Sequence, residues 1–310
     1  MIEPAFLSRQ ARLGEVASTN DIVRGWLADG TAEVCLAVAD VQTAGRGRAG
    51  RTWDAPAGAA LLLSLGFRPA YLPPDRAWRL PATVSLAMAD AAEEVAGLPE
   101  GTIRHKWPND LVVETAGPGA SLVGEIDPTA AAHRLAAPVE LRKLGGVLAE
   151  SDGLGTPDPR LVVGIGVNAD WLESAFPADL AAAMTSLRVA SGGRPIDRSA
   201  LLDAFLAHLE PRVLALRDGR FDITGWLDRA ATTGRDVDLA HPDGRTERAR
   251  AVGLDAVTGA LVVADPGSPD GERQVLGADV VRVRLATAAG TGPVTAAETG
   301  PVSGTSKGRV

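Results

Sequence analysis

Residues 45–53 read Gly45-Arg46-Gly47-Arg48-Ala49-Gly50-Arg51-Thr52-Trp53. Three arginines alternate with small residues, and an indole follows. Glycines let a backbone approach an anion closely, and guanidinium groups bind phosphate oxygens in pairs. The ring of Trp53 offers a flat apolar face on which an aromatic base can stack. The stretch, called the arginine loop below, therefore predicts a nucleotide site.

Other interpretations of the arginine loop are weighed against its context. Gly45, Gly47 and Gly50 also spell the G-x-G-x-x-G fingerprint of dinucleotide sites. That fingerprint needs a helix directly after it and an acidic residue about 20 positions on, and the chain provides neither. Arginine–glycine RNA-binding segments are long and repeated, whereas this one is single and lies between apolar strands. A surface loop without a ligand remains an alternative at this point. The phosphate-binding pattern G-x-x-x-x-G-K-[ST] has no match in the chain.

Composition bounds the class of protein. The chain has 310 residues, of which 45% are apolar and 4% aromatic, and a net charge of −8. Such acidity argues against general nucleic-acid binding, so the arginine loop is a local exception. The single cysteine, Cys35, excludes intrachain disulfides and lies in an apolar run. Because there is no signal peptide and no apolar run of about 20 residues, we expect a cytoplasmic protein with no membrane association.

Patterning predicts helices alternating with strands over the first two thirds of the chain. Ser18-Thr19-Asn20-Asp21 is typical of a helix start, and that helix should end near Gly30. Further helices are predicted at 82–95 and 197–216, the second with an apolar stripe. Strands are predicted at 34–39, 61–67, 102–107, 111–113, 147–149 and 161–167.

The pattern changes after Gly234. Short strands are predicted at 237–240, 249–252, 261–264 and 280–285, separated by Pro-Asp-Gly and Gly-Ser-Pro turns. They favour a small antiparallel barrel of roughly 50 residues, near the lower size limit for a domain. We expect domains at 1–232 and 233–285, an irregular insertion at 114–142, and a disordered tail at 286–310.

Several segments besides the arginine loop carry polar residues in a specific order. They are Ser18-Thr19-Asn20, Lys106-Trp107-Pro108-Asn109-Asp110, Lys143-Leu144-Gly145-Gly146-Val147-Leu148 and Gly164-Ile165-Gly166-Val167-Asn168. With the stretch from Gln42 to Trp53, this ordered set resembles the biotin protein ligases over about residues 15–285. The resemblance implies an α/β (α+β) fold, in which a mixed sheet packed with helices forms the catalytic domain and an SH3-like barrel follows.

The resemblance also implies the reaction. Biotin is activated with MgATP as biotinyl-5′-AMP, and a lysine of a biotin carboxyl carrier domain then takes the biotinyl group. Biotin, ATP and Mg²⁺ are thus the expected ligands, and the carrier domain of a biotin-dependent carboxylase is the expected partner. Such chemistry brings two anions together, so it needs cations more than a nucleophile.

Cationic residues of the motifs match the family's reactive positions. By this resemblance Arg46, Arg48 and Lys106 are the catalytic residues. A compact ammonium at Lys106 can bridge the biotin carboxylate and the α-phosphate. Lys143 matches a second basic position, with a plain solvated lysine as the alternative. The implied nucleotide-binding residues are Arg46, Arg48, Arg51, Trp53, Lys106, Asn109, Lys143 and Asn168. Asp110 is the candidate Mg²⁺ ligand, although aspartates in turns are common.

Neutral polar residues match the family's biotin contacts. Short hydroxyls and amides suit the uncharged ureido head, although helix capping is an alternative for Ser18 and Asn20. Trp107 is as consistent with a core residue as with a ligand-binding residue. The implied biotin-binding residues are Ser18, Thr19, Asn20, Gln42, Arg46, Gly47, Arg48, Lys106, Gly145 and Gly146.

Some expectations concern departures from the family and rival functions. Only 17 residues precede Ser18, so we expect no operator-binding domain and no DNA binding. Separately, we expect a monomer or weak homodimer. We also expect the arginine loop to become ordered when it covers the adenylate. A lipoate or octanoate ligase shares the implied fold and is the closest rival. A non-catalytic biotin-binding or RNA-binding protein is the rival from another class.

Overall fold

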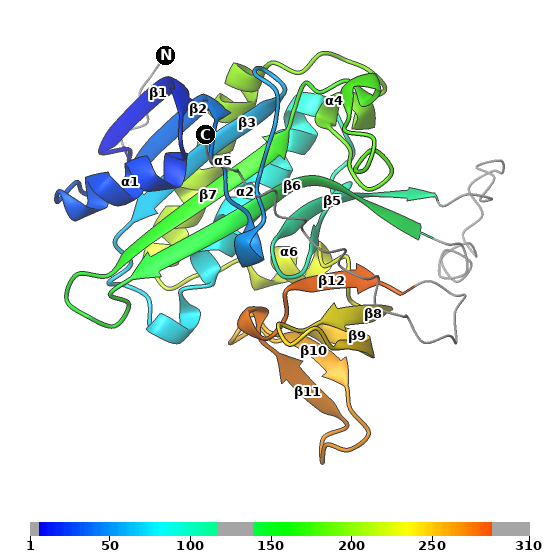
Figure 1. Ribbon diagram of the computed structural model, residues 1–310. Coiled ribbons are helices and arrows are strands. Elements are labelled where there is room, and N and C mark those ends of the chain that lie inside the picture. The colour runs from blue at the N-terminus through cyan, green and yellow to red at the C-terminus, as the bar shows by residue number, and fades with distance from the viewer. Residues whose placement is uncertain (1–5, 117–138, 287–310) are drawn as a thin grey trace, which may run out of the picture.

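The computed structural model describes residues 6–116 and 139–286. Its larger sheet has seven strands in the order β1-β2-β3-β7-β6-β5-β4 (Figure 1). Only the β1–β2 pair is parallel, so the sheet is mixed as expected. The strands are β1 (Arg9–Val16), β2 (Cys35–Gln42), β3 (Ala60–Phe67), β4 (Ile103–Lys106), β5 (Asp110–Ala116), β6 (Val139–Asp152) and β7 (Arg160–Asn168).

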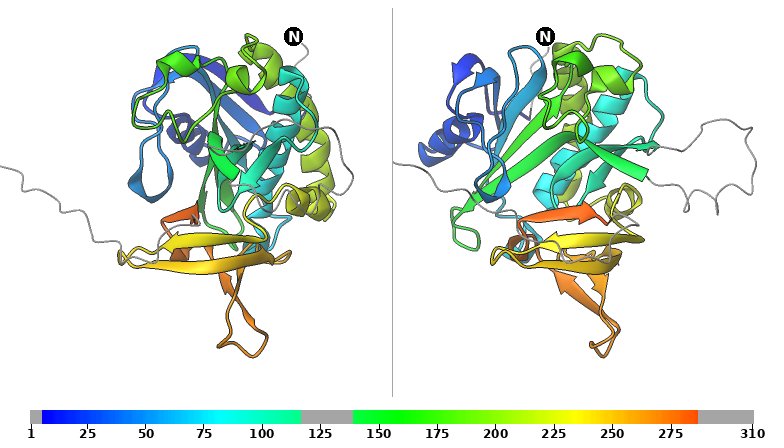
Figure 2. Two further views of the ribbon diagram at one scale, coloured as in Figure 1. Left: turned by 90° about the vertical axis from the view of Figure 1, so that its right-hand side faces the viewer. Right: turned by 45° about the vertical axis from the view of Figure 1, so that its right-hand side comes forward.

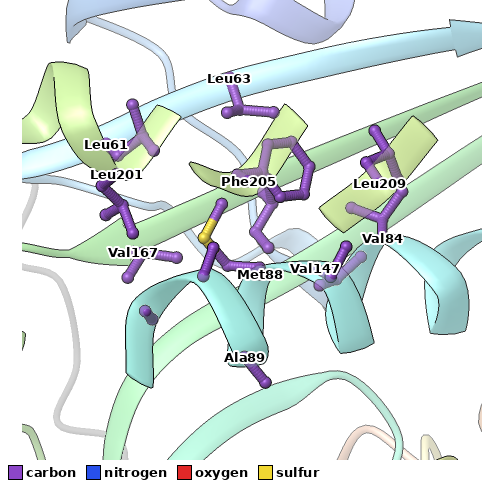
Figure 3. Packing of buried hydrophobic residues seen from close by; sticks show 14 of the residues in the cluster. Leu61, Leu63, Val84, Met88, Ala89, Val147, Val167, Leu201, Phe205 and Leu209 are labelled. Carbon is purple, nitrogen blue, oxygen red and sulfur yellow. The ribbon is translucent and has the colours of Figure 1, made fainter. Parts of the chain in front are cut away.

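Helices cover both faces of this sheet. α2 and α5 pack on one face, where Met88 and Phe205 meet Leu63 and Val167 (Figure 3). α1 packs on the other face through Val23. The helices are α1 (Thr19–Ala28), α2 (Arg79–Ala96), α4 (Leu187–Ala190), α5 (Arg198–Arg217) and α6 (Ile223–Asp228), with short 3₁₀ turns η1 (Arg48–Gly50), η2 (Pro74–Arg76), η3 (Glu173–Ala175) and η4 (Gly277–Asp279).

A second, antiparallel sheet, called the C-terminal sheet below, has the order β11-β10-β9-β8-β12. Figures 1 and 2 show it lying against one end of the larger part of the molecule. Together the two sheets confirm the predicted fold class. The strands are β8 (Arg235–Ala240), β9 (Thr246–Leu254), β10 (Leu261–Ala264), β11 (Glu272–Val275) and β12 (Arg282–Leu285). The domain boundary near residue 232 stays a prediction.

The predicted insertion at 114–142 is wrong at both of its ends. β5 continues to Ala116 and β6 begins at Val139, because the two strands pair with each other as far as these residues. Residues 117–138 of the insertion and 287–310 of the predicted tail lie outside the described residues. Two strands and two helices were not predicted, and α4, which has only four residues, is one of them. β1 and β11 are edge strands with many exposed polar residues, and α6 has only six residues.

The predicted helices and strands are otherwise present, most with their ends moved by a few residues; the strand predicted at 147–149 is the much longer β6, which begins eight residues earlier. The apolar stripe of the third helix is buried from Leu201 to Val213, as its 3.6-residue period requires. Within 6–116 and 139–286, no helix is both long enough and apolar enough to cross a membrane.

Candidate functional site

Two cavities adjoin at the arginine loop. The first, called the polar cavity, has a volume of about 760 Å³ and lies between α1, β6 and β7. Its lining includes the predicted residues Ser18, Thr19, Asn20, Gln42, Arg46, Gly47, Arg48, Arg51, Trp53, Asn109, Lys143, Gly146 and Asn168. The second, called the junction cavity, has about 830 Å³ and lies between the two sheets. Its lining includes the predicted residues Arg46, Gly47, Arg48, Arg51, Lys106, Asn109 and Asp110. The loop therefore borders both.

Backbone hydrogen bonds close the arginine loop on itself. Gly47 N donates to the carbonyl of Arg51 at 2.7 Å, and Trp53 N donates to the carbonyl of Gly45 at 2.9 Å. A side chain at Gly45 would collide with the carbonyl of Trp53, so this turn requires glycine. The loop has a defined conformation here, and its ordering by a ligand stays a prediction.

Arg46 lies in a cluster of four charged side chains. Its guanidinium donates to both carboxylate oxygens of Asp21 at 2.8 Å, and to Glu150 at 3.3 Å. Arg24 donates to the same two carboxylates at 2.6 Å each. The hydrogen bond from Arg46 is the main cause that lowers the pKa of Asp21. Asp21 and Glu150 thus hold one side of the loop against α1 and β6.

Arg48 instead contacts the C-terminal sheet. Its guanidinium donates to the carbonyls of Gly277 and, at 3.2 Å, of Val280. Burial lowers the pKa of Arg48, although an arginine keeps its charge at any physiological pH. The two predicted catalytic arginines therefore have different partners: Arg46 binds carboxylates, and Arg48 binds neutral backbone carbonyls.

A chain of side-chain hydrogen bonds, which ends at the Glu150 carboxylate, lies at one end of the polar cavity. The Gln42 side-chain oxygen accepts from the backbone of Thr19 at 2.7 Å, and Thr19 and Ser64 share a 2.7 Å bond between their hydroxyls. Ser64 donates to the Asn20 side-chain oxygen at 2.6 Å, and the Asn20 amide donates to Glu150 at 2.6 Å. This chain fixes the orientation of the Asn20 amide and of the Gln42 oxygen.

Ser18 lies at the N-cap position of α1, yet its side chain makes no capping hydrogen bond. The capping alternative for Ser18 is therefore wrong. For Asn20 it is wrong as well, since its amide binds Ser64 and Glu150 and the residue lies inside the helix. Both side chains are almost completely buried.

Lys106 and Lys143 flank one carboxylate from opposite sides. Lys143 Nζ lies 2.7 Å from Asp110 Oδ1, and Lys106 Nζ lies 4.0 Å from Asp110 Oδ2. Lys106 and Asp110 are mostly buried. Burial is the main cause that lowers the pKa of Lys106, Asp110 opposes this shift, and Lys143 adds to it. The plain solvated alternative for Lys143 is wrong, because its ammonium pairs with Asp110.

Asp110 does not form a Mg²⁺ site by itself. Two ammonium groups already occupy its surroundings, and they would repel a divalent cation. No group of three acidic, histidine or cysteine side chains in the described ranges could hold a metal ion. A magnesium ion would have to arrive with phosphate oxygens as most of its ligands.

Three glycines form the floor of the polar cavity. A side chain at Gly166 would lie 2.6 Å from the Trp53 ring, and one at Gly146 would lie 3.4 Å from it. A side chain at Gly164 would collide with Asn20. Gly145 differs, because its side-chain position points at the carbonyl of Gly166 and at Leu111, and it lines neither cavity. Trp53 also carries Lys143 Nζ 5.3 Å from its ring centroid, a cation–π contact.

The side-chain amides of the two predicted asparagines each donate one hydrogen bond to a backbone carbonyl. Asn109 donates to the carbonyl of Val147 at 3.0 Å, and Asn168 donates to the carbonyl of Thr185 at 2.9 Å. Trp107 is a core residue, packed among the valines of the C-terminal sheet. Arg51 donates to the carbonyl of Arg48 at 3.1 Å.

Sequence reasoning missed several residues of the site. Asp21, Ser64, Glu150, Gly164 and Gly166 each contact a predicted residue. The only signals were that Asp21 follows Asn20 and that both glycines lie in the Gly164–Asn168 motif. Ser64 lies in the apolar strand β3 and Glu150 near the polar end of β6, and nothing in the sequence marks either of them.

The fold and the site together define a class of ligase. The structure resembles the biotin protein ligase from Aquifex aeolicus solved in complex with biotin and ATP, with a TM-score of 0.66, 23% identity, and coverage of 90% of this chain and 99% of that one. At this identity the likeness concerns the fold. Residues 14–168 match the profile of the Biotin/lipoate A/B protein ligase family. The chain belongs to that family.

Relatives of known description add to the family match. The biotin–[acetyl-CoA-carboxylase] ligase of Paracoccus denitrificans is 29% identical over 81% of this chain and 90% of its own. The protein of the same description from Mycobacterium tuberculosis is 26% identical, over 75% of each chain. The bifunctional ligase/repressor BirA of Bacillus subtilis is 29% identical over 58% of this chain. That alignment spans only 46% of the Bacillus protein, about half its length.

Proposed function

We propose that the chain is an ATP-dependent biotin protein ligase, which forms biotinyl-5′-AMP and transfers biotin to a lysine of a carboxylase carrier domain. The observation that carries the proposal is the meeting of two cavities at one arginine loop. One cavity ends in neutral hydroxyls and amides, and the other contains the Lys106 ammonium. The relatives described as biotin–[acetyl-CoA-carboxylase] ligases support biotin as the acid and the carboxylase carrier as the acceptor.

Biotin would bind with its ureido head at the polar end of the polar cavity. The head has two N–H donors and one carbonyl, so it needs both acceptors and donors. Ser18, Thr19, Asn20 and Gln42 provide these at the ends of α1 and β2. Because Gly164 and Gly166 have no side chains, Asn20 and the Trp53 ring pack directly against the strand backbone, and an aliphatic tail would lie along these two side chains.

In the first step, a carboxylate oxygen of biotin attacks the α-phosphorus of ATP, and the bond to the leaving pyrophosphate breaks. The Lys106 ammonium neutralises the two approaching anions, and Lys143 supplies a second positive charge across Asp110. Arg48 donates to the carbonyls of Gly277 and Val280 through Nη2 alone, so its Nη1 and Nε can donate to phosphate while Nη2 keeps these bonds. The same guanidinium could therefore join the nucleotide to the C-terminal sheet.

In the second step, the amine of the carrier lysine attacks the carbonyl carbon of the mixed anhydride. The bond from that carbon to the phosphate oxygen breaks, AMP leaves with the electron pair, and the amine proton passes to solvent. A closed arginine loop would keep water away from the anhydride until the carrier arrives. Magnesium, bound to the ATP phosphates, would contribute charge neutralisation in the first step.

ATP–pyrophosphate exchange tests the proposal, with biotin, lipoate or no acid supplied in parallel. We expect exchange with biotin alone, and its loss in Lys106→Ala. Arg220→Ala is the matched control, because that cation is 71% exposed and remote from both cavities. Exchange with lipoate instead would assign the chain to the other branch of its family. Exchange with neither acid would contradict the proposal and favour a binding protein. Sedimentation would test our expectation of a monomer or weak homodimer.

A further inference from the structure

The C-terminal sheet has an unusually weak core of its own. Residues 235–285 contain no phenylalanine, tyrosine or tryptophan. The buried side chains that these residues contribute are valines, leucines and alanines. About 50 residues bury too little apolar surface for a secure independent core, and small aliphatic side chains make the deficit larger.

Trp107 supplies the missing aromatic side chain. It lies between β4 and β5 of the larger sheet, yet it packs among Val237, Leu239, Val263 and Val283 with 5% of its surface exposed. Its indole nitrogen donates to the carbonyl of Gly259 at 3.0 Å. A buried indole contributes both a large apolar area and one directed hydrogen bond. The core of the C-terminal sheet is thus completed by a residue from the catalytic part of the chain.

A second indole fixes the same turn of the C-terminal sheet. Trp78, just before α2, donates to the carbonyl of Val257 at 2.8 Å. A side chain at Gly259, which has a φ of 71°, would lie 2.7 Å from the Trp78 ring. The turn from Asp255 to Ala260 is therefore bound between two tryptophans. Arg48 adds a third contact with the C-terminal sheet, through the carbonyls of Gly277 and Val280.

Lys106 is the residue directly before Trp107. Lys106 ends β4 and lies beside Asp110 in the junction cavity. Trp107 begins the turn to β5, packs in the C-terminal core and also borders that cavity. A displacement of Trp107 would move the backbone that holds Lys106, because only one peptide bond separates the two residues.

We propose that Trp107 is a positioning residue, which makes both the folding of the C-terminal sheet and the placement of Lys106 depend on its insertion. The inference depends on the proposed function in one respect only, the role of Lys106 in the formation of biotinyl-5′-AMP. Arg284 of β12 is among the charges that lower the pKa of Lys106, and it lies near Lys106 only while the C-terminal sheet is docked. The titration of Lys106 therefore reports whether Trp107 is inserted.

The test measures two properties of the full chain, without biotin or ATP. Hydrogen exchange follows the amides of β8–β12, with β3 and β7 as an internal reference. Acetylation of Lys106 by acetic anhydride, quantified by mass spectrometry over a range of pH, gives its titration midpoint. The variants are Trp107→Leu, Trp107→Phe and Val283→Ala. Val252→Ala is the matched control, because that valine lies in the same sheet but is 38% exposed.

In Trp107→Leu we expect exchange of β8–β12 to accelerate at least tenfold and the Lys106 midpoint to rise towards that of an exposed lysine. Trp107→Phe should restore most of both properties. Val283→Ala, which leaves β4 untouched, should shift both in the same direction by less, and the control should change neither. If Trp107→Leu also loses protection in β3 and β7, the whole protein is destabilised. In that case the inference is judged on Trp107→Phe and Val283→Ala.

Two results would overturn the inference. Full protection of β8–β12 in Trp107→Leu would mean that the sheet folds without the indole. An unchanged Lys106 midpoint in variants whose C-terminal sheet exchanges rapidly would mean that Lys106 is placed by the larger sheet alone. Because neither readout involves ligation, these results are distinguishable from a failure of the proposed function.

Discussion

Glu93 is predicted to be the side chain on which the edge strand β4, and with it Lys106, depends most. Glu93 lies in α2, and its carboxylate accepts two hydrogen bonds of 2.8 Å from Arg229. It also accepts from the backbone of Ile103, at the start of β4, at 2.7 Å. The side chains of Glu93 and Arg229 are 5% and 8% exposed. The substitution Glu93→Ala removes all three bonds at once.

The magnitude follows from this burial. Removing one partner of a buried ion pair costs about 3–5 kcal/mol, because the remaining charge stays desolvated. Arg229 keeps hydrogen bonds to Asp90 and to the carbonyl of Ile103, both at 2.7 Å, which favours the lower half of that range. The orphaned N–H of Ile103 adds a cost of about 1 kcal/mol or more. We expect a loss of about 4 kcal/mol in the free energy of unfolding.

Urea unfolding followed by circular dichroism measures this loss. With a slope of about 3 kcal/mol per molar urea, the midpoint should fall by about 1.3 M. Arg220→Ala is the control, because it breaks a pair whose members are 71% and 68% exposed, which is worth less than about 1 kcal/mol. A loss below about 1 kcal/mol in Glu93→Ala would refute the reasoning, since it would mean that water or a rearranged Asp90 replaces the carboxylate.

The remaining predictions concern the site. Lys106→Ala should reduce biotin-dependent pyrophosphate exchange by about 10²–10³, as expected for the loss of one preorganised charge contact. Arg48→Ala should reduce exchange similarly and also release biotinyl-AMP into solution, measured by chromatography of the filtrate. Near-normal exchange in both variants would contradict the site assignment. Burial lowers the pKa of Lys106, so the protonated form that stabilises phosphate should be lost at lower pH than for an ordinary lysine. The exchange rate should therefore fall on the alkaline side, and Lys106→Arg, which stays charged, should lack that fall. Amide exchange across Gly45–Trp53 should slow when biotinyl-AMP is bound, and equal protection with and without it would rule out closure of the loop.

The site itself was only partly predictable from the sequence. Residues such as Arg46, Arg48 and Asn20 were selected because each lies in a short motif of adjacent polar or charged residues. Ser64 was not found because it lies in a strand whose pattern signals burial, and Glu150 because it resembles an ordinary polar residue at a strand end. The partners of both are more than 40 positions away. Gly145 was predicted to border biotin, but the pleat of β6 turns it toward Leu111. A one-residue difference along a strand reverses the face, and only pairing with β7 fixes which glycine faces the cavity.

By itself, the sequence determined the chemical class of this protein and most of its secondary structure. The hydrophobic period is a property of neighbouring residues, so it suffices for most of the secondary structure. The chemical class was inferred from ordered motifs that resemble a known family. Tertiary structure decided which carboxylates hold Arg46, which carbonyls hold Arg48, and that Trp107 belongs to the C-terminal core. These contacts join residues far apart in the chain, and their energies depend on burial and distance, which exist only once both sheets have formed.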